Sequence, residues 1–164
     1  MQKVALPEFP VHGGCQCGKV RYTLKAAPLT LYCCHCTECQ RQSASAFGMS
    51  MRVRREDVEV AGKMASIARQ GASGSLLIGE FCPACGVRLF HRRDAYAMHV
   101  SLKAGTLDDT SWLFPAGHIW TGSKQKWVVI AEGGLNYARQ PGDFSALVER
   151  WREMMTDDMP AKEN

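Results

Sequence analysis

Eight cysteines, gathered in three short clusters, constrain this chain of 164 residues more than any other feature of its sequence. The clusters lie at residues 15–17, 33–39 and 82–85. Buried cysteines of a hydrophobic core have no reason to occur in groups, so the spacing favours a chemical role. In a reducing compartment, clustered cysteines indicate metal or redox chemistry, whereas in a secreted protein they indicate disulfides.

The rest of the sequence favours the reducing compartment. No apolar run approaches the roughly 18–20 residues that a membrane span needs. Residues 1–14 contain two prolines and a glutamate and no continuous apolar stretch, which is unlike a signal peptide. We therefore expect a cytoplasmic protein that does not bind membranes and holds its metal with cysteine thiolates.

Each of the two outer clusters could supply half of the ligands of one zinc site. Residues 15–18 read Cys-Gln-Cys-Gly, and residues 82–86 read Cys-Pro-Ala-Cys-Gly. Structural zinc takes four tetrahedral ligands, so neither pair closes a site alone, whereas the two pairs together do. A redox role for the second pair is the alternative, but that motif is expected where a helix begins in a βαβ unit, and the flanking residues here have strand patterns. The predicted structural ligands are Cys15, Cys17, Cys82 and Cys85.

The middle cluster, residues 33–39, offers four thiols and one imidazole within seven residues. If zinc takes three of these ligands, its fourth position stays open to water or a substrate, as in a catalytic site. Spacing alone leaves the ligands undecided. Cys34, Cys36 and Cys39 would make a three-thiolate site, and either Cys33 or His35 would close it.

Alternation of apolar and polar residues predicts a mainly β fold in a single domain, residues 1–164. In residues 18–25, for example, Val20, Tyr22 and Leu24 share one face. Glycine and proline separate the short runs from one another. Further strands are predicted at residues 29–33, 47–53, 58–60, 75–81, 87–91, 96–102 and 127–130.

Two helices complete the predicted fold. A short helix follows the middle cluster, from Thr37 to about Ala44. The second covers about residues 143–156, where Asp143 is a good N-cap. Apolar residues recur there at helical spacing and predict a helix packed on the sheet. They are Phe144, Leu147, Val148, Trp151, Met154 and Met155.

Charge excludes one class of function. The chain has 20 Lys and Arg against 16 Asp and Glu, a formal net charge of +4, with no block of five like charges. Zinc knuckles that bind nucleic acid need a basic and aromatic surface, so we do not expect a nucleic-acid partner. The basic run Arg52, Arg54 and Arg55 is most simply a solvated strand end.

The cysteine motifs, with their neighbours, resemble those of the glutathione-dependent formaldehyde-activating enzymes, a family that also includes centromere protein V. The resemblance covers roughly residues 12–135. The matching stretches are residues 13–22 (GGCQCGKVRY), 34–39 (CHCTEC), 46–48 (AFG) and 81–86 (FCPACG) with Leu89, and more weakly 118–120 (HIW) with Trp127.

This resemblance implies a β-tent-like fold of curved antiparallel sheets around a structural zinc. It implies two Zn²⁺ per chain: one held by Cys15, Cys17, Cys82 and Cys85, and a second, with an open position, held by Cys34, Cys36 and Cys39. In the family's enzymatic members, glutathione adds to formaldehyde to give S-hydroxymethylglutathione, a carbon–sulfur lyase reaction. The partner so implied is glutathione or a related thiol, condensed with formaldehyde or another small carbonyl compound.

Two positions beside the middle cluster differ from the family pattern. The family usually has two arginines after the third cysteine, where this chain has Gln40-Arg41, and a Thr-Gly pair where it has Ser43-Ala44. These differences weaken the transfer of the exact substrate. The alternative function is a non-catalytic zinc-binding module for protein interaction, with both sites closed. The sequence leaves the oligomeric state open, a homo-oligomer included.

Other side chains are candidates for moving protons or binding substrate. Arg41 would bind a glutathione carboxylate, or else lie on a solvated helix face. Three histidines, His35, His99 and His118, would move a proton, although each is more often a structural residue. Cys33 follows two apolar residues in a predicted strand, so we expect a small buried side chain there.

Overall fold

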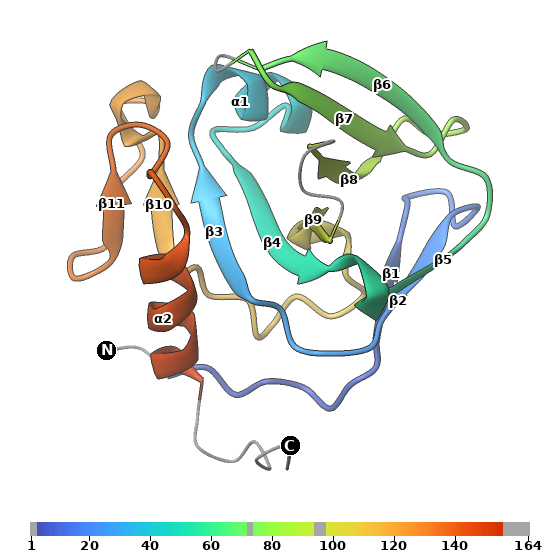
Figure 1. The fold of residues 1–164 in the computed structure, drawn as a ribbon, viewed down its shortest axis with the longest axis horizontal. Helices are drawn as coiled ribbons and strands as arrows, with labels where there is room; N and C mark the ends of the chain where they lie inside the picture. The colour runs from blue at the N-terminus through green and yellow to red at the C-terminus, as the bar shows by residue number, and fades with distance from the viewer. Residues whose placement is uncertain (1–2, 72–73, 94–97, 156–164) are drawn as a thin grey trace.

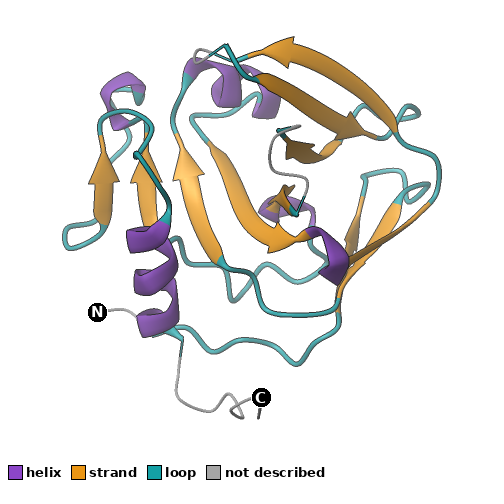
Figure 2. Ribbon diagram, viewed as in Figure 1, coloured by secondary structure: helices purple, strands orange, loops and turns teal. Residues whose placement is uncertain are grey.

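The computed structural model describes residues 3–71, 74–93 and 98–155, and within them the chain is mainly β (Figures 1 and 2). The helices are α1 (Thr37–Ser43) and α2 (Ser145–Met154), with 3-10 turns η1 (Arg55–Asp57), η3 (Ala104–Thr106) and η4 (Thr121–Ser123). The strands are β1 (Val11–Gly14), β2 (Arg21–Leu24), β3 (Thr30–Cys34), β4 (Gly48–Arg54), β5 (Val58–Ala61), β6 (Ala65–Gln70), β7 (Leu76–Phe81), β8 (Arg88–Arg92), β9 (His99–Lys103), β10 (Gly117–Ile119) and β11 (Leu135–Tyr137). The predicted fold class is confirmed.

The smaller sheet has the strand order β1-β2-β5, and its pairings are antiparallel. Its middle strand shows the predicted alternation, since Tyr22 and Leu24 are buried and Arg21 is exposed. The Tyr22 ring meets Phe90 of β8 edge-on, with 5.5 Å between the ring centroids. This sheet therefore packs its apolar face against the larger one.

The larger sheet has the order β11-β10-β3-β4-β9-β8-β7-β6 and is strongly curved (Figure 1). From β3 to β6 each pairing is antiparallel, as predicted. In contrast, β10 runs parallel to both β3 and β11. Parallel neighbours need a long connection, and most of the larger sheet lies between β3 and β10 in the sequence. The alternation of apolar and polar residues along one strand does not indicate a parallel pairing with a distant strand.

The two faces of the larger sheet have different partners. Cross-strand register places one row of apolar side chains on the face that meets the smaller sheet. The opposite face, which we call the helix-bearing face, receives both helices. There the Thr30 hydroxyl donates to the Leu147 carbonyl of α2 over 2.9 Å. The apolar row consists of Leu31, Met51, Leu102 and Phe90.

Several strands differ from the prediction. Short or exposed strands, β1, β6, β10 and β11, were not predicted because they lack a run of alternating apolar residues. The strand predicted at residues 127–130 is wrong. Trp127 and Val129 are exposed there, and the Val128 amide closes a turn on Gln125. Of the strand predicted at 96–102, residues 96 and 97 lie outside the described part, residue 98 is in a turn, and residues 99–102 fall in β9.

The two helices lie where they were predicted, with small changes at their ends. The predicted N-cap, Asp143, is wrong by one residue: α2 begins at Ser145 and its N-cap is Phe144, which makes no side-chain cap hydrogen bond. The Asp143 carboxylate lies just before the helix and accepts a hydrogen bond from the Ser145 amide over 2.8 Å. The predicted apolar stripe is buried at Leu147, Trp151 and Met154. Among the described residues, no helix is both long and apolar enough to cross a membrane.

Candidate metal centre

The first cluster joins the ends of two strands from different sheets. Cys15 and Cys17 follow β1, and Cys82 and Cys85 follow β7. Their four sulfurs all lie within 4.8 Å of one another. The Sγ atoms of Cys15 and Cys17 are 3.5 Å apart, and those of Cys17 and Cys82 are 3.7 Å apart. The structure thus brings together the four predicted ligands.

Two similar turns aim these sulfurs at one point. In the first, the Gly18 amide donates to the Cys15 carbonyl, and in the second the Gly86 amide donates to the Cys82 carbonyl, over 3.1 and 2.8 Å. Both glycines have positive φ, +76° and +78°, a conformation that other residues rarely adopt. The glycine that follows each cysteine pair in the sequence is therefore needed to close the turn.

Hydrogen-bond donors around the first cluster favour the thiolate form of Cys15. Burial alone would raise the pKa of Cys15, but the Val20 amide, 3.2 Å from its Sγ, and the neighbouring sulfurs lower that pKa to about 6. A thiolate is the form that binds metal. The chemistry of this donor set fits zinc.

The second cluster lies where β3 ends and α1 begins. Cys34 is the last residue of β3, Cys36 is the N-cap of α1, and Cys39 lies in the first turns of the helix. Their three sulfurs lie within 4.8 Å of one another. The Cys36 sulfur also accepts a hydrogen bond from the Cys39 amide over 3.3 Å. The residue that starts the helix thus also belongs to the cluster, a role that the sequence analysis missed.

Burial and charge differ within the second cluster. Cys34 is buried, whereas Cys36 and Cys39 are partly exposed. Hydrogen bonds from Cys34 and Cys39 lower the pKa of Cys36 to about 2. The same hydrogen bond raises the pKa of Cys34. Within the cluster, Cys36, which is partly exposed, is therefore the sulfur that most favours the thiolate form.

Cys33 and His35, the two residues that would have closed this site, face elsewhere. Cys33 is buried, and its burial raises the pKa of its thiol to about 12. The fully buried His35 ring shares a hydrogen bond of 2.9 Å between its Nε2 and Nδ1 of His118. Among the described residues, the potential ligand group here consists of three cysteines.

The backbone of His35 ties α1 to the η4 turn. Its carbonyl accepts hydrogen bonds from the Gln40 amide group at 2.7 Å and from the Ser123 hydroxyl at 3.0 Å. His35 and His118 thus hold β3, α1 and β10 together. His99 lies four residues before Lys103 on β9, where burial and the nearby Arg52 and Arg54 lower its pKa.

Arg41 lies on the surface of α1. Its side chain is 77% exposed and pairs with Glu38 over 3.0 Å, three residues before it on the same helix. This placement matches the solvated-face interpretation of Arg41. In the nearby basic run, Arg52 lies over the Phe144 ring at 5.2 Å and Arg54 pairs with Asp57 at 4.0 Å.

Lys103 is a neighbour of the second cluster that the sequence analysis missed. It is 7% exposed, and its ammonium donates to the Ser50 hydroxyl over 3.4 Å. Burial lowers the pKa of Lys103, while the charge of the nearby cysteine cluster, Cys39 and Cys34 first, opposes that shift. The alternation of β9 places Lys103 away from the apolar row, which in a sequence is the usual sign of a solvated side chain.

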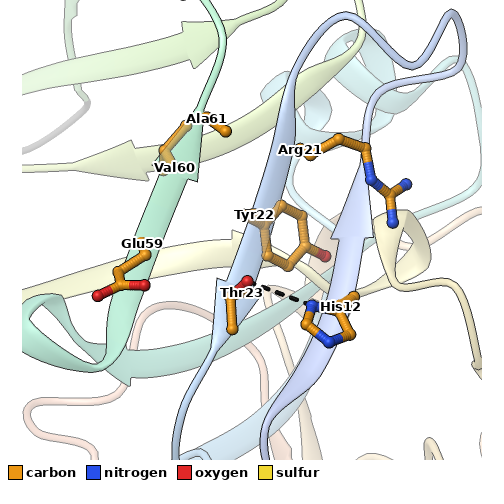
Figure 3. A pocket seen from close by; sticks show the side chains of 7 residues that line it. All are labelled: His12, Arg21, Tyr22, Thr23, Glu59, Val60 and Ala61. Carbon is orange, nitrogen blue, oxygen red and sulfur yellow. Dashed lines mark hydrogen bonds between the residues drawn. The ribbon is translucent and has the colours of Figure 1, made fainter.

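A surface cavity of about 420 Å³ lies on the smaller sheet and is lined by residues of β1, β2 and β5 (Figure 3). Its polar side chains are already paired: His12 with Thr23 at 3.2 Å, Arg21 with Asp108, and Glu59 with Lys25. It offers no cysteine. The lining residues are His12, Arg21, Tyr22, Thr23, Glu59, Val60 and Ala61.

Comparison with known proteins identifies the family. The sequence model of the glutathione-dependent formaldehyde-activating enzymes matches residues 10–123, which contain both cysteine clusters. No curated protein matches the chain. The crystal structure of a Rhodobacter sphaeroides protein is similar, with a TM-score of 0.48 and 21% identity, covering 61% of this chain and 90% of that one. Because the family match spans more than half of the sequence, the chain belongs to the glutathione-dependent formaldehyde-activating enzyme family.

Proposed function

We propose that this protein is a zinc-dependent carbon–sulfur lyase-type enzyme. It condenses glutathione, or a related thiol, with formaldehyde or another small carbonyl compound. In this reaction a carbon–sulfur bond forms, the carbonyl π bond breaks, and the thiol proton ends on the former carbonyl oxygen. Family membership supports the substrate class.

The donor geometry supports a closed zinc site at the first cluster. A regular tetrahedron with zinc–sulfur distances of about 2.3 Å has its sulfurs about 3.8 Å apart. The 3.5 and 3.7 Å separations of Cys17 from Cys15 and Cys82 agree with this value. Four thiolates would fill this zinc, so we assign it a structural role. Because it would join both sheets, we treat residues 1–164 as one domain.

One observation carries the assignment of an active site: the second cluster offers three sulfurs, with Cys33 and His35 turned away. Zinc held by Cys34, Cys36 and Cys39 would keep one position open, and there it would lower the pKa of a bound thiol and make that thiol a nucleophile at neutral pH. Cys36 and Cys39 are partly exposed, so this position lies toward solvent. We place the reaction in the cytoplasm, where thiols are kept reduced.

The buried histidine pair would keep this site in place. His35 follows Cys34 directly, and its ring and carbonyl are held by His118, Gln40 and Ser123. A rigid support matters because reacting groups must be held within a fraction of an ångström of their productive geometry.

The test combines metal content with turnover. We expect two zinc ions per chain, and after cobalt substitution one four-thiolate spectrum and one spectrum that changes when glutathione is added. The purified protein should accelerate formation of S-hydroxymethylglutathione over the spontaneous reaction. Two unchanging four-thiolate sites would favour a non-catalytic zinc module instead. Normal zinc content without any acceleration would remove formaldehyde as the substrate.

A further inference from the structure

Two basic side chains share the helix-bearing face with the second cluster. Register pairs Cys34 of β3 with Gly48 of β4, and Ser50 of β4 with Lys103 of β9. Because alternate residues of a strand share a face, as do paired residues of neighbouring strands, Lys103 and Cys34 lie on the same side of the sheet. By the same rule, Ser101 of β9, its partner His91 of β8 and its partner in turn, Gly79 of β7, also lie on this side of the sheet.

Glycines leave room for both cations. A Cβ at Gly48 would lie 3.7 Å from the Cys39 sulfur and 3.7 Å from the Lys103 ammonium, so these two groups are neighbours over one glycine. A Cβ at Gly79 would overlap the Arg88 guanidinium, which therefore lies directly over that glycine. Both charged ends thus lie on the helix-bearing face of the larger sheet.

Neither cation has a carboxylate partner within the described part of the chain. Lys103 is almost fully buried, and its hydrogen bond goes to the neutral Ser50 hydroxyl. The Arg88 Nε atom is buried without a hydrogen-bond acceptor. Glu38, on the same side of the sheet, pairs with Arg41 and Arg69 instead. The negative charge that opposes their burial comes from the cluster sulfurs. Because a buried cation without a hydrogen-bonded anion is costly, the arrangement suits a carboxylate beside the cluster.

The electrostatics of the site agree with this geometry. Burial lowers the pKa of Arg88, and the Cys39 thiolate opposes that shift, as it does for Lys103. The charge of Arg88 also lowers the pKa of Lys103. Burial and both cations lower the pKa of His91, so that ring is neutral and adds a hydrogen-bonding group without a charge. A positive field therefore borders the second cluster.

We propose that Lys103 and Arg88 form an anion-binding site that receives a carboxylate of the thiol substrate. This inference rests on the proposed function, and it names the substrate class more closely: a thiol with a carboxylate on the same molecule, as in glutathione. Arg41 does not fill this role, since it lies on the outer surface of α1 with Glu38. Lys103 and Arg88 are thus specificity-determining residues, and the cysteines remain the reacting site.

Binding of S-methylglutathione, measured by calorimetry, tests the site without turnover. This probe has both carboxylates, but its sulfur can neither react nor bind as a thiolate. Lys103→Met and Arg88→Met should each weaken its binding at least about tenfold, the usual scale for loss of a charge-assisted hydrogen bond. The surface controls Lys126→Met and Arg139→Met, at exposed positions, should bind it as the unmodified protein does.

A second probe separates charge from shape. The dimethyl ester of S-methylglutathione has no carboxylate, so it should bind the unmodified protein weakly and should not distinguish that protein from either variant. Lys103→Arg, which keeps the charge, should retain most of the affinity for the free acid. Far-ultraviolet circular dichroism and the melting temperature establish that each variant is folded. Equal binding of the free acid by folded Lys103→Met, Arg88→Met and the unmodified protein overturns the anion site.

The same variants distinguish this inference from the proposed function. If S-methylglutathione binds through Lys103 and Arg88 but formaldehyde turnover is absent, the anion site stands and the lyase assignment fails. If turnover is present, both variants should raise the KM for glutathione at least about tenfold while changing kcat less. If turnover is present and the KM for glutathione is unchanged in both variants, the anion site is refuted and the lyase assignment is retained.

Discussion

At the scale of single residues, Cys33 and Cys34 show how one step along a strand changes the role of a side chain. Both are buried thiols at the end of β3. Cys34 faces Cys36, the N-cap of α1, and Cys39 of that helix, whereas Cys33 faces the other side of the sheet and is not part of the sulfur group. The alternation of the strand, rather than the chemistry of the residue, decides which thiol can bind metal.

Serine substitution of these neighbouring cysteines should separate their roles. Cys34→Ser should lower the zinc content from two ions to one per chain and leave the melting temperature nearly unchanged. Cys33→Ser, equally buried one residue away, should retain both ions and is the matched control. Inductively coupled plasma mass spectrometry counts the metal. Loss of an ion in Cys33→Ser would contradict our assignment of the ligands.

A cysteine of the first cluster should behave differently. Cys82→Ser is expected to lose the metal of that site and to unfold or aggregate, because structural zinc contributes about 10–16 kcal/mol of apparent binding free energy that is coupled to folding. The comparison is made by thermal unfolding beside Cys34→Ser. Equal stability of the two variants would mean that our division into structural and active sites is wrong.

How much of the site could be predicted differs from residue to residue. The first cluster followed from spacing, because two incomplete pairs and a four-ligand metal have one simple solution. Spacing could not choose among the five donors of residues 33–39, since that choice depends on which way each side chain points. Lys103 and Arg88 could not be found either, because their burial beside the cluster arises from strand register over most of the larger sheet.

At the scale of secondary-structure elements, α2 contributes packing rather than chemistry. It lies outside the span that matches the family, yet Trp151 and Leu147 are fully buried against the sheet. Its position also depends on a glycine: a Cβ at Gly117 of β10 would press against the Leu147 side chain, 2.7 Å from its Cδ2 atom. The helix therefore fits a space that β10 leaves free.

Removing the largest buried side chain of α2 should be costly. Trp151→Ala is expected to lower the free energy of unfolding by about 3–5 kcal/mol, the range for large aromatic truncations in a core. Arg152→Ala, exposed on the same helix, should change it by less than about 0.5 kcal/mol. Urea unfolding of the zinc-loaded protein measures both. A loss below about 1 kcal/mol in Trp151→Ala would show that α2 is not part of the cooperative core.

The end of β5 has a different constraint. Gly62 has φ of +99°, and a Cβ there would overlap the carbonyl of Lys19, in the turn that holds Cys17. Gly62→Ala should therefore destabilise the protein by about 1–3 kcal/mol. Gly105→Ala, where a Cβ meets nothing within 4 Å, is the control. The melting temperatures of the two variants check this, and equal values would contradict it.

The elements themselves were predictable where alternation was strong, as in β2, and where an apolar stripe had helical spacing, as in α2. The prediction failed where a strand forms only because neighbouring strands pair with it. β10 has three residues, and its place between β3 and β11 comes from parallel pairing with both. Residues 127–130 show the opposite failure, since an apolar run without a partner strand remains a loop.

At the scale of the whole molecule, the two clusters link different amounts of the structure. The first cluster links strand ends from the two sheets, through cysteines 65 residues apart in sequence. The second joins only a strand and the helix that directly follows it. Loss of the first would therefore remove a link between the sheets, which would then be joined only by their packed core, while loss of the second would loosen one local turn.

Removal of metal should accordingly proceed in two stages. A chelator is expected to take the zinc of the second cluster first, because it has three ligands and two of them are partly exposed. The fold should persist at this stage and be lost with the second ion. Chelator titration followed by circular dichroism and metal release checks the order. Release of both ions in one step, with simultaneous unfolding, would contradict it.

The distance along the chain between the halves of the first cluster also bears on synthesis. While the ribosome has made only the first turn, Cys15 and Cys17 are two donors without the other half of a tetrahedron. The site can be completed only when the turn after β7 has emerged with Cys82 and Cys85. If zinc fills this site as we propose, it can do so only after the smaller sheet and the strands of the larger sheet up to β7 have been made. A cell short of zinc would then accumulate chains in which this site is incomplete and its thiols are free.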